Sequence, residues 1–172
     1  MPCNLTQGFT LGCKEYAGGI KEVKIKALPI NPADFTISAG NQVTIAAGSE
    51  TGWYRYQFRQ ETASFTETTN VNEQNATLFF QDELKFKLEN LSAANSQELQ
   101  TLAKNNVLVA IKTNAGKCLL MGLFYGAYMT TTQATTGTAF GDFYGYEVTL
   151  QYKDTHPIYE ISESQYNSLT QS

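Results

Sequence analysis

The sequence contains one histidine, His156, within the stretch Asp154-Thr155-His156-Pro157. A relay of the Ser-His-Asp type centred on it would need Asp154 and a distant serine or cysteine. A proline and polar neighbours that follow an alternating segment are instead typical of a turn. We therefore interpret His156 as structural and expect no catalytic residue around it.

Metal binding requires several histidine, cysteine or carboxylate side chains at defined spacings. Cys3, Cys13 and Cys118 are scattered, odd in number and without CxxC spacing. They fit neither a disulfide framework nor a zinc site, so we interpret them as free, partly buried thiols. With one histidine and no HExxH or EF-hand pattern, the sequence predicts neither a metal nor a cofactor.

Carboxylates that could supply a glycosidase-like acid and base also occur in the sequence. They are Asp82, Glu83, Asp142 and Glu147. Each lies in or beside a segment of alternating polarity, where a solvated surface is the simpler interpretation. The glycine-rich pieces at 18–19 and 137–145 lack the Lys-Ser/Thr ending of a P-loop, which favours turns. The sequence thus predicts a protein that is not an enzyme.

The composition is that of a β-rich globular chain. Its 172 residues include ten Tyr and ten Phe but one Trp, and aromatic and β-branched side chains favour strands. A formal charge of -4 without a basic cluster disfavours tight nucleic-acid binding. No apolar run approaches the roughly 20 residues of a membrane span, so we expect no membrane insertion. The first residues do not resemble a secretory signal, which favours folding in the cytoplasm.

The clearest strand pattern runs from about 74 to 88. Apolar Leu78, Phe80, Leu84, Phe86 and Leu88 alternate there with polar residues, and only Phe79 and Asp82 break the pattern. A single strand of that length exceeds the usual five or six residues, and it could build a sheet between subunits. The alternative is two shorter strands with a bulge near 81–82.

Other segments predict shorter elements. Strands are expected from Ile20 to Pro29, over 53–60 and over 144–152, and hairpins over 34–45 and 107–123. One helix is expected at about 95–105, with Asn95 as its cap and Glu98 three residues later. The threonine-rich stretch 130–141 fits either an edge strand or a mobile loop. We expect one domain, 1–172, with an N-terminal arm at about 1–19 and a polar C-terminal tail at about 162–172 that need not be ordered.

Several of these stretches resemble the tail tube proteins of siphophage-type and related bacteriophages. The matching residues are the helix at 96–104, the hairpin VAIKTNAGKCLLMG at 109–122 and the run TGTAFGDFYGYEVTL at 136–150. The opening GCKEYAGGIKEV at 12–23 resembles the start of virion proteins from phages of this kind. Together they cover about a third of the chain directly. None of them is a catalytic signature.

This resemblance implies a mainly β fold, an antiparallel β-sandwich or half-barrel with one short flanking α-helix. It also implies rings of six copies that stack through loops and terminal arms around a channel for the genome. The implied partners are further copies of the chain, the tape measure, tail terminator and any sheath protein, with DNA passing through non-specifically. The implied location is the virion tail, after assembly in the host cytoplasm.

Within this interpretation the sequence does not separate the strand at 74–88 from the strand at 53–60 as the channel wall. The longer one is the first candidate, with Glu83 among the residues that could face the channel. An acidic balance would let DNA slide without sticking, whereas a basic channel lined by Lys85 and Lys87 would contradict this. Two alternatives stay open. The chain could be another virion component, such as a capsid decoration, neck or baseplate subunit, or it could be a carbohydrate-binding β-sandwich.

Overall fold

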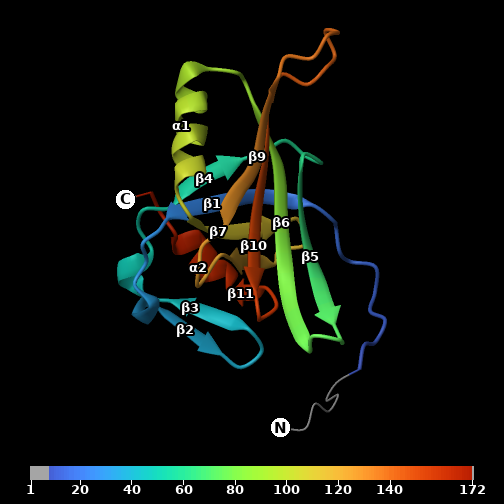
Figure 1. The fold of residues 1–172 in the computed structure, drawn as a ribbon, viewed down its shortest axis with the longest axis vertical. Helices are drawn as coiled ribbons and strands as arrows, with labels where there is room; N and C mark the ends of the chain where they lie inside the picture. Colours follow the sequence, from blue (N-terminus) through green and yellow to red (C-terminus); the bar gives the residue numbers. More distant parts are fainter. Residues whose placement is uncertain (1–7, 172) are drawn as a thin grey trace.

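The computed structural model describes residues 8–171, which form two packed β-sheets with one main helix beside them (Figure 1). The seven-stranded sheet has the order β2-β3-β11-β8-β7-β1-β4, and the four-stranded sheet has the order β5-β6-β10-β9. Apart from the short parallel contact between β11 and β3, the strands pair antiparallel. The expected fold class, mainly β with a sandwich and a short flanking helix, is confirmed.

The strands of the seven-stranded sheet are β1 (Ile20–Ala27), β2 (Phe35–Ser38), β3 (Gln42–Ile45), β4 (Tyr54–Gln57), β7 (Val107–Thr113), β8 (Cys118–Met121) and β11 (Tyr159–Ile161). Those of the four-stranded sheet are β5 (Ala63–Asn72), β6 (Thr77–Glu89), β9 (Tyr128–Thr135) and β10 (Gly145–Asp154). The helices are α1 (Ala93–Lys104) and α2 (Glu163–Ser168), with 3-10 turns at Pro32–Asp34 and Ala47–Ser49.

The centre of the seven-stranded sheet is buried on both faces, which explains the continuous apolar run of β7. Val107, Val109 and Ile111 face the core shared with the four-stranded sheet and α1. The alternate residues Leu108 and Ala110 face a second core, which contains Trp53 and Tyr166. A strand buried on both faces needs apolar side chains at successive positions, because neighbouring residues point to opposite faces.

The long strand is continuous. β6 pairs with β10 from Phe80 to Glu89 and with β5 from Thr77 to Phe86, with no register shift in either ladder. The alternative of two strands with a bulge near 81–82 is therefore wrong. Its partner β5 was not predicted, since its Thr, Asn and Glu residues give little apolar signal.

Both expected hairpins are confirmed. β2 and β3 meet at a turn in which Gly40 and Asn41 have φ of 80° and 60°, a conformation that suits these two residue types. β7 and β8 pair around residues 114–117. The threonine-rich stretch divides into the edge strand β9 and a loop that begins at residue 136.

The helix begins two residues earlier than expected. Ser92, not Asn95, is its N-cap, and the Ser92 hydroxyl accepts a 3.1 Å hydrogen bond from the Asn95 amide. Sequence spacing alone favoured Asn95 because its partner Glu98 imitates a capping box. In the structure Glu98 instead accepts a 2.9 Å hydrogen bond from the Tyr56 hydroxyl.

The end of the chain is a packed element and not a free polar tail. α2 occupies most of the range 162–172, and Tyr166 and Leu169 are buried in the second core. The ammonium of Lys24, a buried residue of β1, donates to the carbonyl oxygens of Tyr166 at 2.7 Å and Leu169 at 2.8 Å. The lysine thus anchors the C-terminal segment to the sheet.

The N-terminal arm is described from residue 8 onward and lies away from both cores. Its large apolar side chains, Phe9, Leu11 and Tyr16, are exposed. Cys13 is an exposed free thiol on the arm, whereas Cys118 is buried in β8 and burial raises the pKa of its thiol. Cys3 lies outside the described residues.

Candidate functional site

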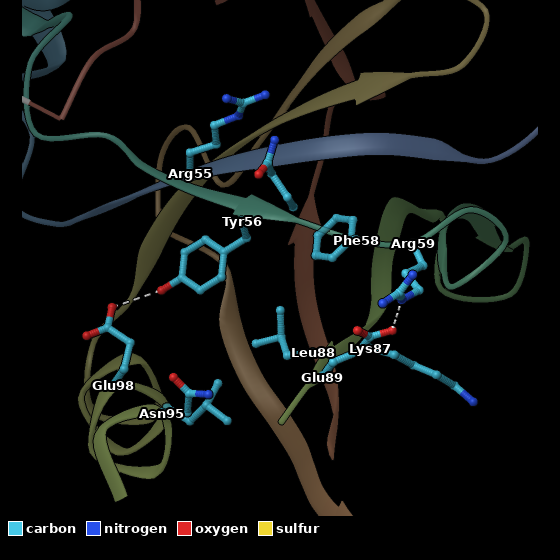
Figure 2. A pocket seen from close by; sticks show the side chains of 11 residues that line it. Arg55, Tyr56, Phe58, Arg59, Lys87, Leu88, Glu89, Asn95 and Glu98 are labelled. Atoms are coloured by element: carbon cyan, nitrogen blue, oxygen red, sulfur yellow. Dashed lines mark hydrogen bonds and ion pairs between the residues drawn. The ribbon is translucent and has the colours of Figure 1, made fainter. Parts of the chain in front are cut away.

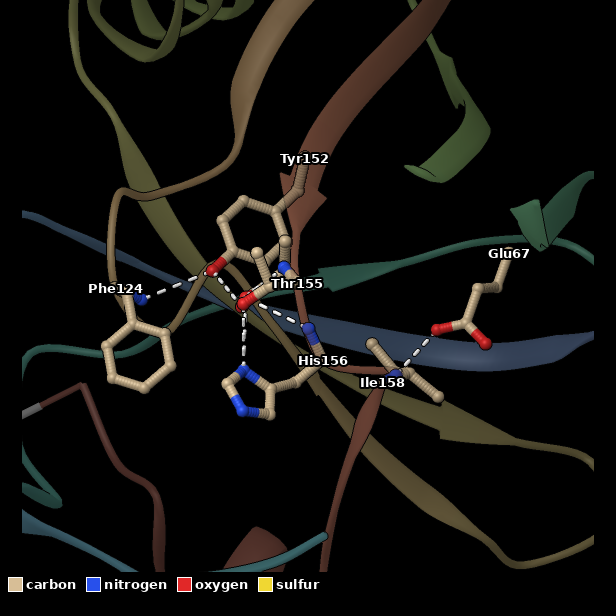
Figure 3. A network of polar contacts seen from close by, with 7 residues as sticks. Glu67, Phe124, Tyr152, Thr155, His156 and Ile158 are labelled. Atoms are coloured by element: carbon tan, nitrogen blue, oxygen red, sulfur yellow. Dashed lines mark hydrogen bonds and ion pairs between the residues drawn. The ribbon is translucent and has the colours of Figure 1, made fainter. Parts of the chain in front are cut away.

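The histidine lies in a turn network that follows β10 (Figure 3). The carboxylate of Asp154 accepts hydrogen bonds from the Tyr152 hydroxyl at 2.6 Å and from the amides of Thr155 at 2.6 Å and His156 at 3.2 Å. The Thr155 hydroxyl and the Asp154 carboxylate approach the same ring nitrogen of His156, Nδ1, at 3.2 and 3.5 Å. A catalytic relay needs its nucleophile and its acid on opposite ring nitrogens, so these contacts order a turn.

The structure does not bring the four carboxylates considered in the sequence together. Asp82 points into the core and is 3% exposed, whereas Glu83 lies on the outer face of the same strand. Glu147 also lies on that outer face, where it forms a 2.8 Å ion pair with Lys87. Asp142 belongs to the β9–β10 loop and accepts backbone hydrogen bonds there. No acid and base pair follows from this arrangement.

A different carboxylate pair, missed from the sequence, lies inside the sandwich. Glu67 of β5 is the cross-strand partner of Asp82. Burial, together with the charges of Glu67 and Asp154, raises the pKa of Asp82 to about 7. Glu67 also accepts a 2.5 Å hydrogen bond from the Ile158 amide, so it ties the edge strand to the segment after β10 (Figure 3).

A groove between β4 and α1 is lined by charged and aromatic side chains (Figure 2). Its volume is about 480 Å³, and its basic residues include Arg55, Arg59 and Lys87. Each of them pairs with a carboxylate, Arg55 with Glu22, Arg59 with Glu89 and Lys87 with Glu147. The groove therefore offers little uncompensated positive charge to an anionic ligand.

The outer face of the four-stranded sheet is a continuous polar surface. Its polar residues include Ser64, Thr66, Thr68, Gln81, Glu83, Lys85, Lys87, Gln133, Glu147, Thr149, Gln151 and Lys153. Opposite charges neighbour one another across this face. Glu83 forms a 2.8 Å ion pair with Lys85 and accepts a 3.0 Å hydrogen bond from Gln151. The face is thus polar, and most of its charge is compensated.

The edge strands of this sheet are β5, with ten residues, and β9, with eight. Each has a partner on one side only within the described chain. An edge strand presents unpaired backbone amides and carbonyls, which are a ready template for pairing with another chain. The edge strands of the other sheet, β2 and β4, have four residues each. The four-stranded sheet therefore carries the longer free edges.

Within residues 8–171 no group of three His, Cys, Asp or Glu side chains is placed to hold a metal ion. The helices described over the same range fall short of the length and apolarity that a bilayer crossing requires. Comparisons with protein-family models, with curated proteins and with solved structures found no match to this chain.

Proposed function

We propose that this chain is a tail tube subunit of a tailed bacteriophage, which assembles into stacked rings that enclose the channel for genome delivery. The observation that carries the proposal is the four-stranded sheet, which combines two long free edges with a polar outer face. The resemblance of the 109–122 hairpin and the 136–150 run to that family adds a ring of six copies as the expected assembly.

The two edges fit a head-to-tail ring. β5 and β9 lie on opposite sides of one sheet, so β9 of each copy can pair with β5 of its neighbour. An interface between two different surfaces repeats around a ring when its rotation closes. Closure into a continuous barrel pairs both edge strands of the four-stranded sheet, which removes the longer free edges as templates for uncontrolled aggregation.

In such a ring the outer face of the four-stranded sheet lines the channel. Glu83 then faces the channel, as does Lys85 beside it, and the two form an ion pair. Lys87 is compensated by Glu147. Proteins hold nucleic acids through Lys and Arg side chains that pair with phosphates. A threonine-rich wall whose lysines are already paired with carboxylates would therefore let DNA pass without binding it tightly. The ring would act in the virion tail, with the tape measure, tail terminator and any sheath protein as neighbours.

The experiment is a proline scan of the β5 edge combined with sedimentation of the purified full chain. Successive amides of a strand point to opposite sides, so of Thr68 and Thr69 one donates to β6 and the other points to the free edge. Of the variants Thr68→Pro and Thr69→Pro, we expect one to stay folded and lose association and the other to lose stability. If both single variants fold and associate as the unmodified protein does, the proposal is contradicted.

A further inference from the structure

The β9–β10 loop, residues 136–144, projects beyond the body at one end of the four-stranded sheet (the orange loop at the top of Figure 1). It carries Phe140, whose side chain is 113% exposed and contacts no part of the described chain closely enough to be covered. Together with Tyr144, which is 48% exposed, Phe140 gives the loop an aromatic surface that a second molecule can reach.

The loop holds Phe140 in a defined position. The carboxylate of Asp142 accepts 2.8 Å hydrogen bonds from the amides of Thr138 and Ala139. Gly137 adopts a φ of +66°, and a Cβ at this position would lie 2.3 Å from the Cβ of Asp142. The tight turn therefore requires glycine at 137 and orders the backbone on either side of Phe140. A loop ordered before binding loses less conformational entropy on docking.

An aromatic pocket lies at the opposite end of the same sheet. It has a volume of about 510 Å³, and its walls include Phe79, Phe124, Tyr125 and His156. Phe124 is 50% exposed and Tyr125 74% exposed. Aromatic rings attract one another in edge-to-face and offset arrangements, so this pocket suits a further aromatic side chain.

Strand β10 connects the two features and fixes their separation. Its first residue, Gly145, follows the loop, and its last, Asp154, lines the pocket. Ten residues of strand span roughly 33 Å. The loop of one copy therefore points away from its own pocket. The two features can meet only when a second copy lies end to end with the first.

The charges of the two ends also match. The loop carries one charged side chain, Asp142, and the backbone hydrogen bonds from Ala139 and Thr138 lower the pKa of its carboxyl. The pocket wall carries both Lys153 and Asp154. Asp154 is buried, and its carboxylate already accepts hydrogen bonds from Tyr152, Thr155 and His156, whereas Lys153 is exposed. The Lys153 ammonium lies 5.8 Å from the ring centre of Phe79. The negative loop would thus approach the pocket on the side of the exposed Lys153.

We propose that Phe140 of one copy inserts into the pocket around Phe124 and Tyr125 of the next copy, and that this contact stacks the rings along the channel axis. The stacking role rests on the proposed function, whereas the contact itself depends only on the two ends of the sheet. A projection at one end and a pocket at the other form a head-to-tail contact, which repeats as a filament.

The test compares the substitutions Phe140→Ser and Tyr125→Ser, which change opposite halves of the contact. Both side chains are largely exposed, so both variants should fold. Each should raise the protein concentration needed for stacking by at least about tenfold, because buried aromatic anchors dominate interface energies. Tyr54→Ser, an exposed aromatic on the other sheet, is the matched control and should stack as the unmodified protein does.

Mixing the two variants gives the sharper result. The intact loop of the Tyr125→Ser chain can still enter the intact pocket of the Phe140→Ser chain, but the reverse contact is lost. The mixture should therefore form paired particles that contain one layer of each variant and grow no further. Electron microscopy and mass photometry read out this limited pairing.

The two proposals fail in different ways. Full-length stacks from both variants would overturn the Phe140 contact while leaving ring formation intact. Absence of rings in the unmodified protein would contradict the tail tube role. If no rings form, dimers of one Phe140→Ser chain and one Tyr125→Ser chain would still support the Phe140 contact. The absence of such dimers would overturn it.

Discussion

Glu67 on β5 and Asp82 on β6 are direct cross-strand partners that both lie on the core side of the four-stranded sheet. One oxygen of Asp82, Oδ1, has no hydrogen-bond partner among the described residues. Tyr152 is the partner of Asp82 on β10, and Asp154 adds a further negative charge. Two carboxylates that face each other beside a core favour a shared proton, so β5 is held most firmly when Asp82 is protonated.

This pair predicts a stability that falls with rising pH. Asp82 has a folded pKa raised to about 7 from 3.8, so the unfolded chain releases this proton first. Its stabilising contribution is complete below about pH 4 and is lost as the pH rises to about 7. Asp82→Asn keeps a donor toward Glu67 without the charge. We expect this variant to match the unmodified protein near pH 4 and to exceed it by about 1–3 kcal/mol at pH 8.

Denaturant unfolding followed by fluorescence of Trp53 measures this difference, because Trp53 is the single tryptophan and is buried. Glu83→Gln is the control at the neighbouring, outward-facing position. Lys85 and Gln151 lower the pKa of Glu83, so this substitution should bring no gain in stability at pH 8. A loss of stability in Asp82→Asn at pH 8 would refute the proton-sharing pair.

The start of β10 predicts a strict size limit. A Cβ on Gly145 would lie 2.1 Å from the carbonyl oxygen of Leu88, a backbone atom of the neighbouring strand. Gly145→Ala should therefore force the two strands apart and lower the free energy of unfolding by about 1–3 kcal/mol. At Gly141, in the loop before β10, a Cβ would meet no atom within 4 Å, so Gly141→Ala is the control. Equal stabilities of the two variants would contradict the close approach.

The anchoring of the C-terminal segment predicts an effect at Lys24. Lys24→Ala would leave the carbonyl oxygens of Tyr166 and Leu169 buried without their donor. We expect a loss of about 2–4 kcal/mol, since hydrogen bonds from a charged donor are strong and buried carbonyls are costly to leave unpaired. Hydrogen exchange should show the loss of protection concentrated in residues 163–171.

Lys21→Ala provides the comparison, because Lys21 is an exposed residue of the same strand. It should change stability by less than about 0.5 kcal/mol. If both lysine variants were equally stable, the anchoring role assigned to Lys24 would be wrong.

Sequence periodicity was sufficient to locate a strand where one of its faces is buried and the other is exposed to solvent. It located β6 and β10 because their apolar residues alternate, and it located the β7–β8 hairpin because an apolar run precedes turn residues. It missed β5, whose stability comes from ten residues of pairing with β6 rather than from its own apolar side chains. It also missed α2, since only Tyr166 and Leu169 bury its surface and Lys24 supplies the anchor from far along the chain.

The residues of the candidate sites were harder to predict from the sequence than the strands. Asp82 stood out as a break in the alternation, but its partner Glu67 lies on the strand that periodicity did not find. Phe140 was only part of a threonine-rich stretch that fitted either an edge strand or a mobile loop, because the exposure of a single aromatic side chain is a property of the fold. Its relation to Phe124 and Tyr125 depends on the direction of β10, which places loop and pocket at opposite ends.

The central claim is that copies of this chain join through the edges of the four-stranded sheet into rings around a channel. Cryo-electron microscopy of the purified full-length protein tests it most directly. We expect closed rings, and stacks of rings at higher concentration, in which β9 of each copy pairs with β5 of the next and Glu83 faces the channel. Monomers at all concentrations, or rings whose contacts leave β5 and β9 unpaired, would contradict the claim.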